Sequence, residues 1–155
     1  MLLISMIMAL NADPAPAAPQ APGDLFAGLA GYCWRGETPS SRDTHCFTGS
    51  NGGKLVLDVH KLRTLDNYLV YEGVTVYRTD AATGKVSFVY YTSQADLVPG
   101  EASRDGNDLQ VVMQMANGPV SQTWHINGNS YDVSSPMMPT TVRFKKVGQA
   151  PEGGL

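Results

Sequence analysis

The sequence predicts an all-β domain, namely an antiparallel up-and-down β-barrel of about eight to ten strands with a short N-terminal helix. From residue 32 onward, apolar and polar residues alternate with a period of two in a series of short runs, as in half-buried strands. Turn-forming Gly, Asn and Asp residues separate the runs, which favours sequential antiparallel pairing. Because only closure removes both exposed edges of such a meander, we favour a barrel and place an open sandwich second.

The composition is typical of a single domain and argues against a nucleic-acid partner and against a membrane-spanning helix. The chain has 155 residues, of which 16% are charged, and a net charge of -3. A length of this order is typical of a single domain. The negative charge speaks against a nucleic-acid partner. No apolar run reaches the ~18 residues of a membrane-spanning helix, so we expect no membrane span.

The N-terminal residues 1–23 resemble an export signal followed by a linker. The stretch Met1–Leu10 is apolar, and residues 11–23 are rich in Pro and Ala. An apolar segment before small residues is typical of a secretory signal, and we place the cleavage after Ala12. No Lys or Arg precedes the apolar run, so a disordered N-terminus is the alternative. Export predicts a periplasmic or secreted protein, with a barrel domain over residues 24–148 and a flexible tail over 149–155.

Residues 24–31 predict the one short helix. Asp24 is placed to cap the first turn, and Leu25, Phe26 and Leu29 supply an apolar side before Gly31 ends the helix. One or two turns are not stable alone. We therefore expect this helix to dock on the barrel and to plug one of its ends.

The strands follow in order, and most show which side faces inward. Residues 54–62 place Leu55, Leu57 and Val59 on one face, with Lys54, Asp58 and His60 on the polar face. The strand over residues 69–78 leaves its inward face open, because both faces mix polar and apolar residues. Later strands give clear inward sets, which are Val86, Phe88 and Tyr90; Leu109, Val111, Met113 and Met115; Val120, Gln122, Trp124 and Ile126; and Val142 and Phe144.

The segment Leu-Ala-Gly-Tyr-Cys-Trp-Arg-Gly, residues 29–36, resembles the first strand of the calycin superfamily, which includes lipocalins and fatty-acid-binding proteins. It is also similar to exported bacterial barrels of unassigned function, in which Cys-Trp-Arg-Gly is followed by Asp-Thr-His-Cys-Phe, here residues 43–47. The resemblance implies a structural closure in which a late Arg stacks over the first-strand Trp and seals the barrel floor. The matching residues are Trp34 and Arg143. Gly31 lies one residue farther from Trp34 than the family's Gly-x-Trp pattern requires.

Cys33 and Cys46 lie thirteen residues apart and are the two cysteines of the chain. In an exported protein we expect them to form a disulfide, which in the chain-entropy model contributes roughly 3 kcal/mol for a loop of this size. In a cytoplasmic protein they would be two free thiols.

The sequence offers little for catalysis or metal binding. Neither a Cys-x-x-Cys nor a His-Glu-x-x-His spacing surrounds the histidines, so we expect no metal and interpret His60 and His125 as solvent-facing. His45-Cys46 is at most a weak metal signal. The patterns of nucleophilic hydrolases and of phosphate-binding loops are missing. We therefore predict no catalytic residue and no cofactor, and interpret Asp58, Glu72, Asp96 and Glu101 as solvated surface charges.

Aromatic and methionine side chains carry the remaining functional signal. An eight-stranded barrel is just wide enough to be filled by side chains or to hold one small ligand. The hypothesis is a non-catalytic barrel of the cell envelope that binds or carries a small apolar ligand. The alternatives are a packed barrel that acts through a surface partner and, last, a haem-binding barrel that uses His125. The predicted ligand contacts are Tyr71, Tyr77, Phe88, Tyr90, Met113, Met115 and Trp124.

Overall fold

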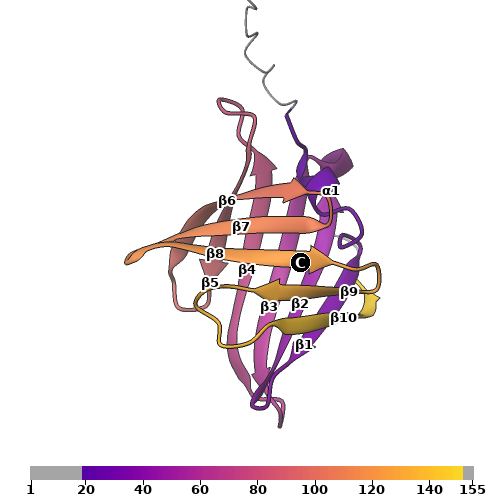
Figure 1. The fold of residues 1–155 in the computed structure, drawn as a ribbon, viewed down its shortest axis with the longest axis vertical. Coiled ribbons are helices and arrows are strands. Elements are labelled where there is room, and N and C mark those ends of the chain that lie inside the picture. Colours follow the sequence, from indigo (N-terminus) through magenta and orange to yellow (C-terminus); the bar gives the residue numbers. More distant parts are fainter. Residues whose placement is uncertain (1–18, 152–155) are drawn as a thin grey trace, which may run out of the picture.

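The computed structural model describes residues 19–151 and is a closed barrel of ten antiparallel strands (Figure 1), which confirms the predicted fold class. Among the described residues, no helix is both long and apolar enough to cross a membrane. The predicted signal segment and most of the Pro- and Ala-rich linker, together residues 1–18, lie outside the described residues, as does the end of the tail, residues 152–155. The elements are α1 (Pro22–Leu25), β1 (Tyr32–Glu37), β2 (Ser41–Ser50), the 3-10 turn η1 (Asn51–Gly53), β3 (Leu55–Thr64), β4 (Leu69–Thr79), β5 (Val86–Thr92), β6 (Leu97–Asp105), β7 (Asp108–Met115), β8 (Gly118–Ile126), β9 (Ser130–Ser134) and β10 (Val142–Gln149).

Each strand pairs with its neighbours in sequence, and β1 pairs with β10 to close the barrel. Because the strands run alternately up and down, the connections fall into two groups at opposite ends. The mouth end carries the β1–β2, β3–β4, β5–β6, β7–β8 and β9–β10 connections. The helix end carries α1 and the remaining connections. In Figure 1, β6 to β10 cross in front of β2, β3 and β4, so the two halves of the barrel enclose a common interior.

The N-terminal segment plugs the helix end, as its apolar side predicts. Leu25, Phe26 and Leu29 are fully buried. The Phe26 ring packs against Tyr77 at 4.4 Å between ring centroids, and it contacts Trp124 at 6.4 Å. The floor of the barrel is therefore made of aromatic side chains from α1's C-terminal turn and from the strands.

The helix itself differs from its prediction in length and capping. It covers only Pro22–Leu25, and its N-cap is Ala21, which makes no side-chain capping hydrogen bond. Pro at the first helical position needs no N–H partner and carries a φ suited to a helix, so Asp24 falls inside the first turn. Beyond the helix, Arg104 Nη1 donates 2.8 Å hydrogen bonds to the carbonyls of Leu25 and Ala27. This arginine ties the plug to β6, which the sequence did not indicate.

The prediction that Arg143 stacks over Trp34 to close the barrel is wrong for Arg143. Arg143 points outward and donates two 2.7 Å hydrogen bonds to the Asp132 carboxylate, which lowers the pKa of Asp132. The reason is alternation along β10, because Phe144 occupies the inward position. The cation near the buried Trp34 indole is Lys146, which is its partner across a bulge in the β1–β10 pair. Lys146 Nζ lies 5.2 Å from the Trp34 ring and 3.4 Å from the Tyr32 ring.

This arrangement makes Lys146, rather than Arg143, the cation that supports the β1–β10 seam. We expect Lys146→Gln to lower the free energy of unfolding by about 0.5–1 kcal/mol, the range for a cation–π contact at a partly exposed site. Urea unfolding monitored by circular dichroism measures the change. Arg143→Gln is the matched control and should have the smaller effect, since its partner Asp132 is on the outer surface. A larger loss for Arg143→Gln would contradict this assignment.

Cys33 and Cys46 form the expected disulfide. The two residues face each other directly in the β1–β2 pair, with Cα atoms 4.0 Å apart. The bond therefore joins two adjacent strands next to the seam where the barrel closes, and both cysteines of the chain are used.

The inward face of β3 is the reverse of the predicted one. Val56 and Asp58 are buried and His60 points into the barrel, whereas Leu57 and Val59 lie half-buried on the outer face. Both faces of this strand carry aliphatic residues, so the alternation defines two faces without showing which one is inside. The inner face carries Asp58 and His60, and this reversal produces the site described next.

Candidate functional site

The barrel encloses a cavity of about 290 Å³ that reaches toward the mouth end. Thr38 and Met138, from the β1–β2 and β9–β10 connections, contribute to its lining, and Tyr77 and Trp124 lie next to Phe26 at its floor. Most of its wall is apolar, and one side is polar. The apolar and aromatic lining residues are Leu62, Tyr77, Phe88, Tyr90, Val111, Met113, Trp124, Val133, Met138, Val142 and Phe144.

Five of the seven predicted ligand contacts line this cavity, namely Tyr77, Phe88, Tyr90, Met113 and Trp124. Tyr71 is not among the lining residues, although it is paired with Leu62 and its ring contacts those of Tyr90 and His60. Met115 is exposed, because β7 runs beyond the cavity at the mouth end before it turns into β8. Alternation thus predicts the correct face of β7 but not how far the cavity extends along it.

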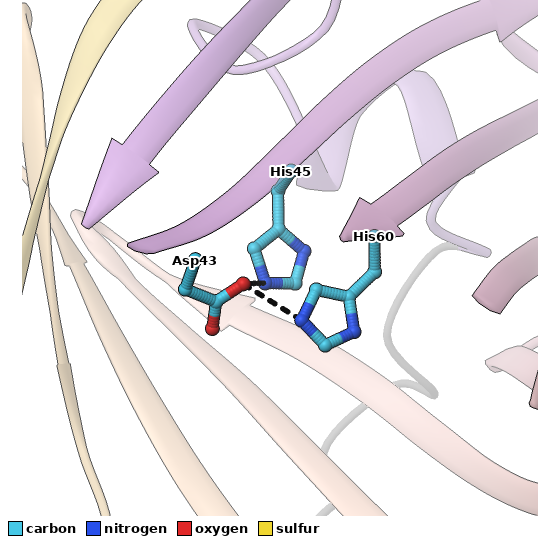
Figure 2. Close-up of side chains that lie close together, drawn as sticks. All are labelled: Asp43, His45 and His60. Atoms are coloured by element: carbon cyan, nitrogen blue, oxygen red, sulfur yellow. Dashed lines mark ion pairs between the residues drawn. The ribbon is translucent and has the colours of Figure 1, made fainter. Parts of the chain in front are cut away.

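The polar side of the cavity comes from two Asp-x-His segments on neighbouring strands. Asp43 and His45 belong to β2, and Asp58 and His60 belong to β3. Residues two apart on a strand share a face, so each segment directs both of its side chains inward. The hairpin register places His45 directly opposite His60, and the two rings stack with centroids 4.4 Å apart. Figure 2 shows both imidazoles directed at the Asp43 carboxylate.

Each imidazole is held at one nitrogen and faces Asp43 with the other. His45 Nδ1 is 2.7 Å from Asp58 Oδ2, and His60 Nδ1 is 2.7 Å from the Tyr90 hydroxyl. The Nε2 atoms of His45 and His60 lie 3.6 and 2.7 Å from the same oxygen, Asp43 Oδ1. The outer contacts thereby fix the orientation of both rings.

The cluster has unusual electrostatics because it is mostly removed from solvent. Burial disfavours a charged His45, but the adjacent Asp58 carboxylate, helped by Asp43, outweighs it and raises the pKa of His45 to about 9. Burial likewise opposes ionisation of Asp43, yet the contacts with His60 and His45 lower the pKa of that carboxyl. Opposite charges at these distances favour the ionised form of each partner.

Three polar atoms of the cluster are buried without a hydrogen bond to any described residue. They are Asp43 Oδ1, His60 Nε2 and Asp58 Oδ1. Asp43 Oδ1 and His60 Nε2 are close enough for an ion pair, but their contact lacks hydrogen-bond geometry. Buried polar atoms are normally satisfied, so this side of the cavity has unused capacity to bind a polar group.

The tyrosines around the cavity act as neutral hydroxyls. Burial raises the pKa of Tyr77, Tyr90 and Tyr131, and the nearby carboxylates add to the effect. The hydroxyl of Tyr90 contacts His60, whereas the buried Tyr131 hydroxyl has no partner among the described residues.

The sequence reasoning missed this cluster. It placed His60 and Asp58 on the solvent side, but Asp58 is 2% exposed. The repeated Asp-x-His pattern, at residues 43–45 and 58–60 across a predicted hairpin, was the available signal. The interpretation of His125 as solvent-facing is correct, because it pairs with Asp108 on the outer surface with its side chain 49% exposed. His125 therefore lies on the outside of the barrel, whereas a haem-binding barrel would need this histidine in its interior.

No protein-family model matches the chain, and no curated protein matches it in sequence. The interpretation of the site therefore depends on its geometry.

Proposed function

We propose that the barrel binds a small amphipathic molecule in its cavity, with the apolar part against the aromatic wall and a polar group at the Asp43–His60 side. The observation that carries the proposal is a cavity with one charged side inside a closed barrel. Ligand sites commonly combine a mostly apolar lining with a few convergent polar groups. The proposed ligand therefore has a polar end, whereas the sequence alone suggested a purely apolar ligand.

The size and lining of the cavity limit the ligand. Its volume of about 290 Å³ is at the lower end of the roughly 300–1,000 Å³ range of ligand pockets. Phe88, Trp124 and Phe144 offer ring faces, and Met113 and Met138 offer flexible side chains that adapt to shape. A compact aromatic or short-chain molecule suits this space better than a long lipid.

The mouth end supports entry of such a molecule. Large apolar side chains are exposed in or beside the connections there, and they are Leu65, Tyr68, Leu97, Met115 and Met137. Exposed apolar side chains gathered at one end mark a site of interaction with an apolar partner. They surround the end of the barrel at which Thr38 and Met138 line the cavity.

Membership of the calycin superfamily and a place in the cell envelope belong to the same proposal. The closed antiparallel barrel and the Cys33–Cys46 disulfide support them, since disulfides persist in oxidising compartments. A packed barrel without a ligand is the second candidate, but it leaves the cavity and its buried polar atoms without a role.

Binding of the neutral environment-sensitive dye N-phenyl-1-naphthylamine, an apolar molecule with one N–H group, tests the proposal. We expect saturable fluorescence enhancement at one site per chain, and we expect Met113→Trp to weaken it at least about tenfold, or about 1.4 kcal/mol, because the indole fills the cavity. Met115→Trp is the matched control on the same face of β7 but in an exposed position, and it should bind like the wild type. Circular dichroism of both variants checks that they fold. Absence of saturable binding, or equal loss in both variants, would reject an internal site.

A further inference from the structure

The Asp43, His45 and His60 side chains form a three-atom donor set on the wall of the cavity. Asp43 Oδ1 and one nitrogen from each histidine all lie within 4.8 Å of one another. In a tetrahedral zinc site, with metal–ligand distances of about 2.0–2.2 Å, the donor atoms are separated by about 3.3–3.6 Å. The distances from Asp43 Oδ1 to His45 Nε2 and His60 Nε2 are 3.6 and 2.7 Å. The His45 Nε2 separation already suits such a site, and His60 Nε2 would have to move away from Asp43 Oδ1 by about 0.6–0.9 Å.

The hydrogen-bond partners of the two histidines are of the kind that surrounds the ligands of a metal site. A metal-binding histidine commonly uses its second nitrogen to bond a carboxylate or another acceptor, which fixes the ring. His45 has Asp58 in this position and His60 has the Tyr90 hydroxyl, each at 2.7 Å. Both Nε2 atoms are thus left to face the same point beside Asp43 (Figure 2).

Charge and unused bonding capacity favour a dication at this point. Asp43 and Asp58 place two carboxylates inside the barrel, and Asp58 is almost completely buried. Buried charges are normally paired or coordinate a metal. Asp43 Oδ1 and His60 Nε2, two of the three donor atoms, are buried without a hydrogen bond to any described residue.

We infer that Asp43, His45 and His60 bind one Zn²⁺ ion inside the barrel, with Asp58 and Tyr90 orienting the two histidines. Two imidazole nitrogens and one carboxylate oxygen are a donor set that suits zinc. Three protein ligands leave a further coordination position, and the donors lie on the cavity wall. The inference does not depend on the amphipathic ligand.

Zinc titration of the full chain, after removal of any tag and treatment with chelator, tests the inference. Calorimetry should show one Zn²⁺ per chain. His60→Gln and Asp43→Asn should each weaken binding at least about tenfold. His125→Gln removes the histidine of the exposed Asp108 pair and is the matched control, which should keep the wild-type affinity.

Long-range proton–nitrogen NMR spectra of the histidine rings provide a readout that needs no variant. The chain has three histidines. Zinc should shift the Nε2 resonances of His45 and His60 and leave His125 unchanged. Absence of binding, a shift confined to His125, or loss of binding in His125→Gln would overturn the inference. If zinc does not bind, the cluster is a hydrogen-bonded polar network only, and dye binding in the cavity should be unaffected.

Discussion

Phe26→Ala is expected to lower the free energy of unfolding by about 3–5 kcal/mol, the range for truncating a fully buried phenylalanine. The ring is completely inaccessible and packs against Phe47, Tyr77 and Trp124, with centroid distances of 5.4, 4.4 and 6.4 Å. These neighbours belong to three different strands, so they cannot close over the space together without moving the sheet. Guanidinium unfolding monitored by tryptophan fluorescence measures the loss.

The matched control for Phe26→Ala is Asp24→Ala, two residues earlier in the same segment. Asp24 is exposed and does not cap the helix, so its replacement should change stability by no more than about 0.5 kcal/mol. Phe26→Leu, which keeps most of the apolar volume, should fall between the two. Equal effects of the alanine variants would mean that the segment acts through its backbone contacts, such as those with Arg104, rather than as an aromatic plug.

The sequence predicts the barrel well because the fold depends on patterns that extend over the whole chain. The inward sets around Phe88, Val111 and Trp124 are confirmed, since these strands each have one clearly apolar face. In β3 the same reasoning chose the wrong face. An interior that contains Asp58 and His60 violates the usual distribution of polar residues, and a pattern that assumes an apolar interior cannot find it.

The errors at individual sites have a similar origin. Trp34 is buried as the resemblance implies, but its cation is Lys146, because the bulge in the β1–β10 pair decides which side chain of β10 reaches the indole. A bulge shifts the register by one residue and is not visible in a periodic pattern. The candidate zinc donors likewise come together through the register that pairs His45 with His60. The three donor residues match no standard metal-site spacing in the sequence, because they lie on two paired strands of a hairpin rather than on one helix.

Removal of the Cys33–Cys46 disulfide is expected to lower the free energy of unfolding by about 3 kcal/mol. In the chain-entropy model the bond restricts the unfolded chain over a separation of 13 residues, and loops of about this size give this value. The two cysteines are already adjacent through the β1–β2 register, so the folded barrel should persist without the bond. Urea unfolding of Cys33→Ser/Cys46→Ser, compared with the wild type, measures the change.

Reductant distinguishes the bond from the loss of the cysteine side chains. Dithiothreitol should lower the unfolding midpoint of the wild type to that of the double serine variant and leave the variant itself unchanged. Because β1 also forms the β1–β10 seam, amide hydrogen exchange should increase first in β1 and β2 if loss of the bond loosens the closure locally. An unchanged midpoint in wild-type protein whose mass shows complete reduction would contradict a stabilising role and would make the bond incidental to strands that the sheet already holds together.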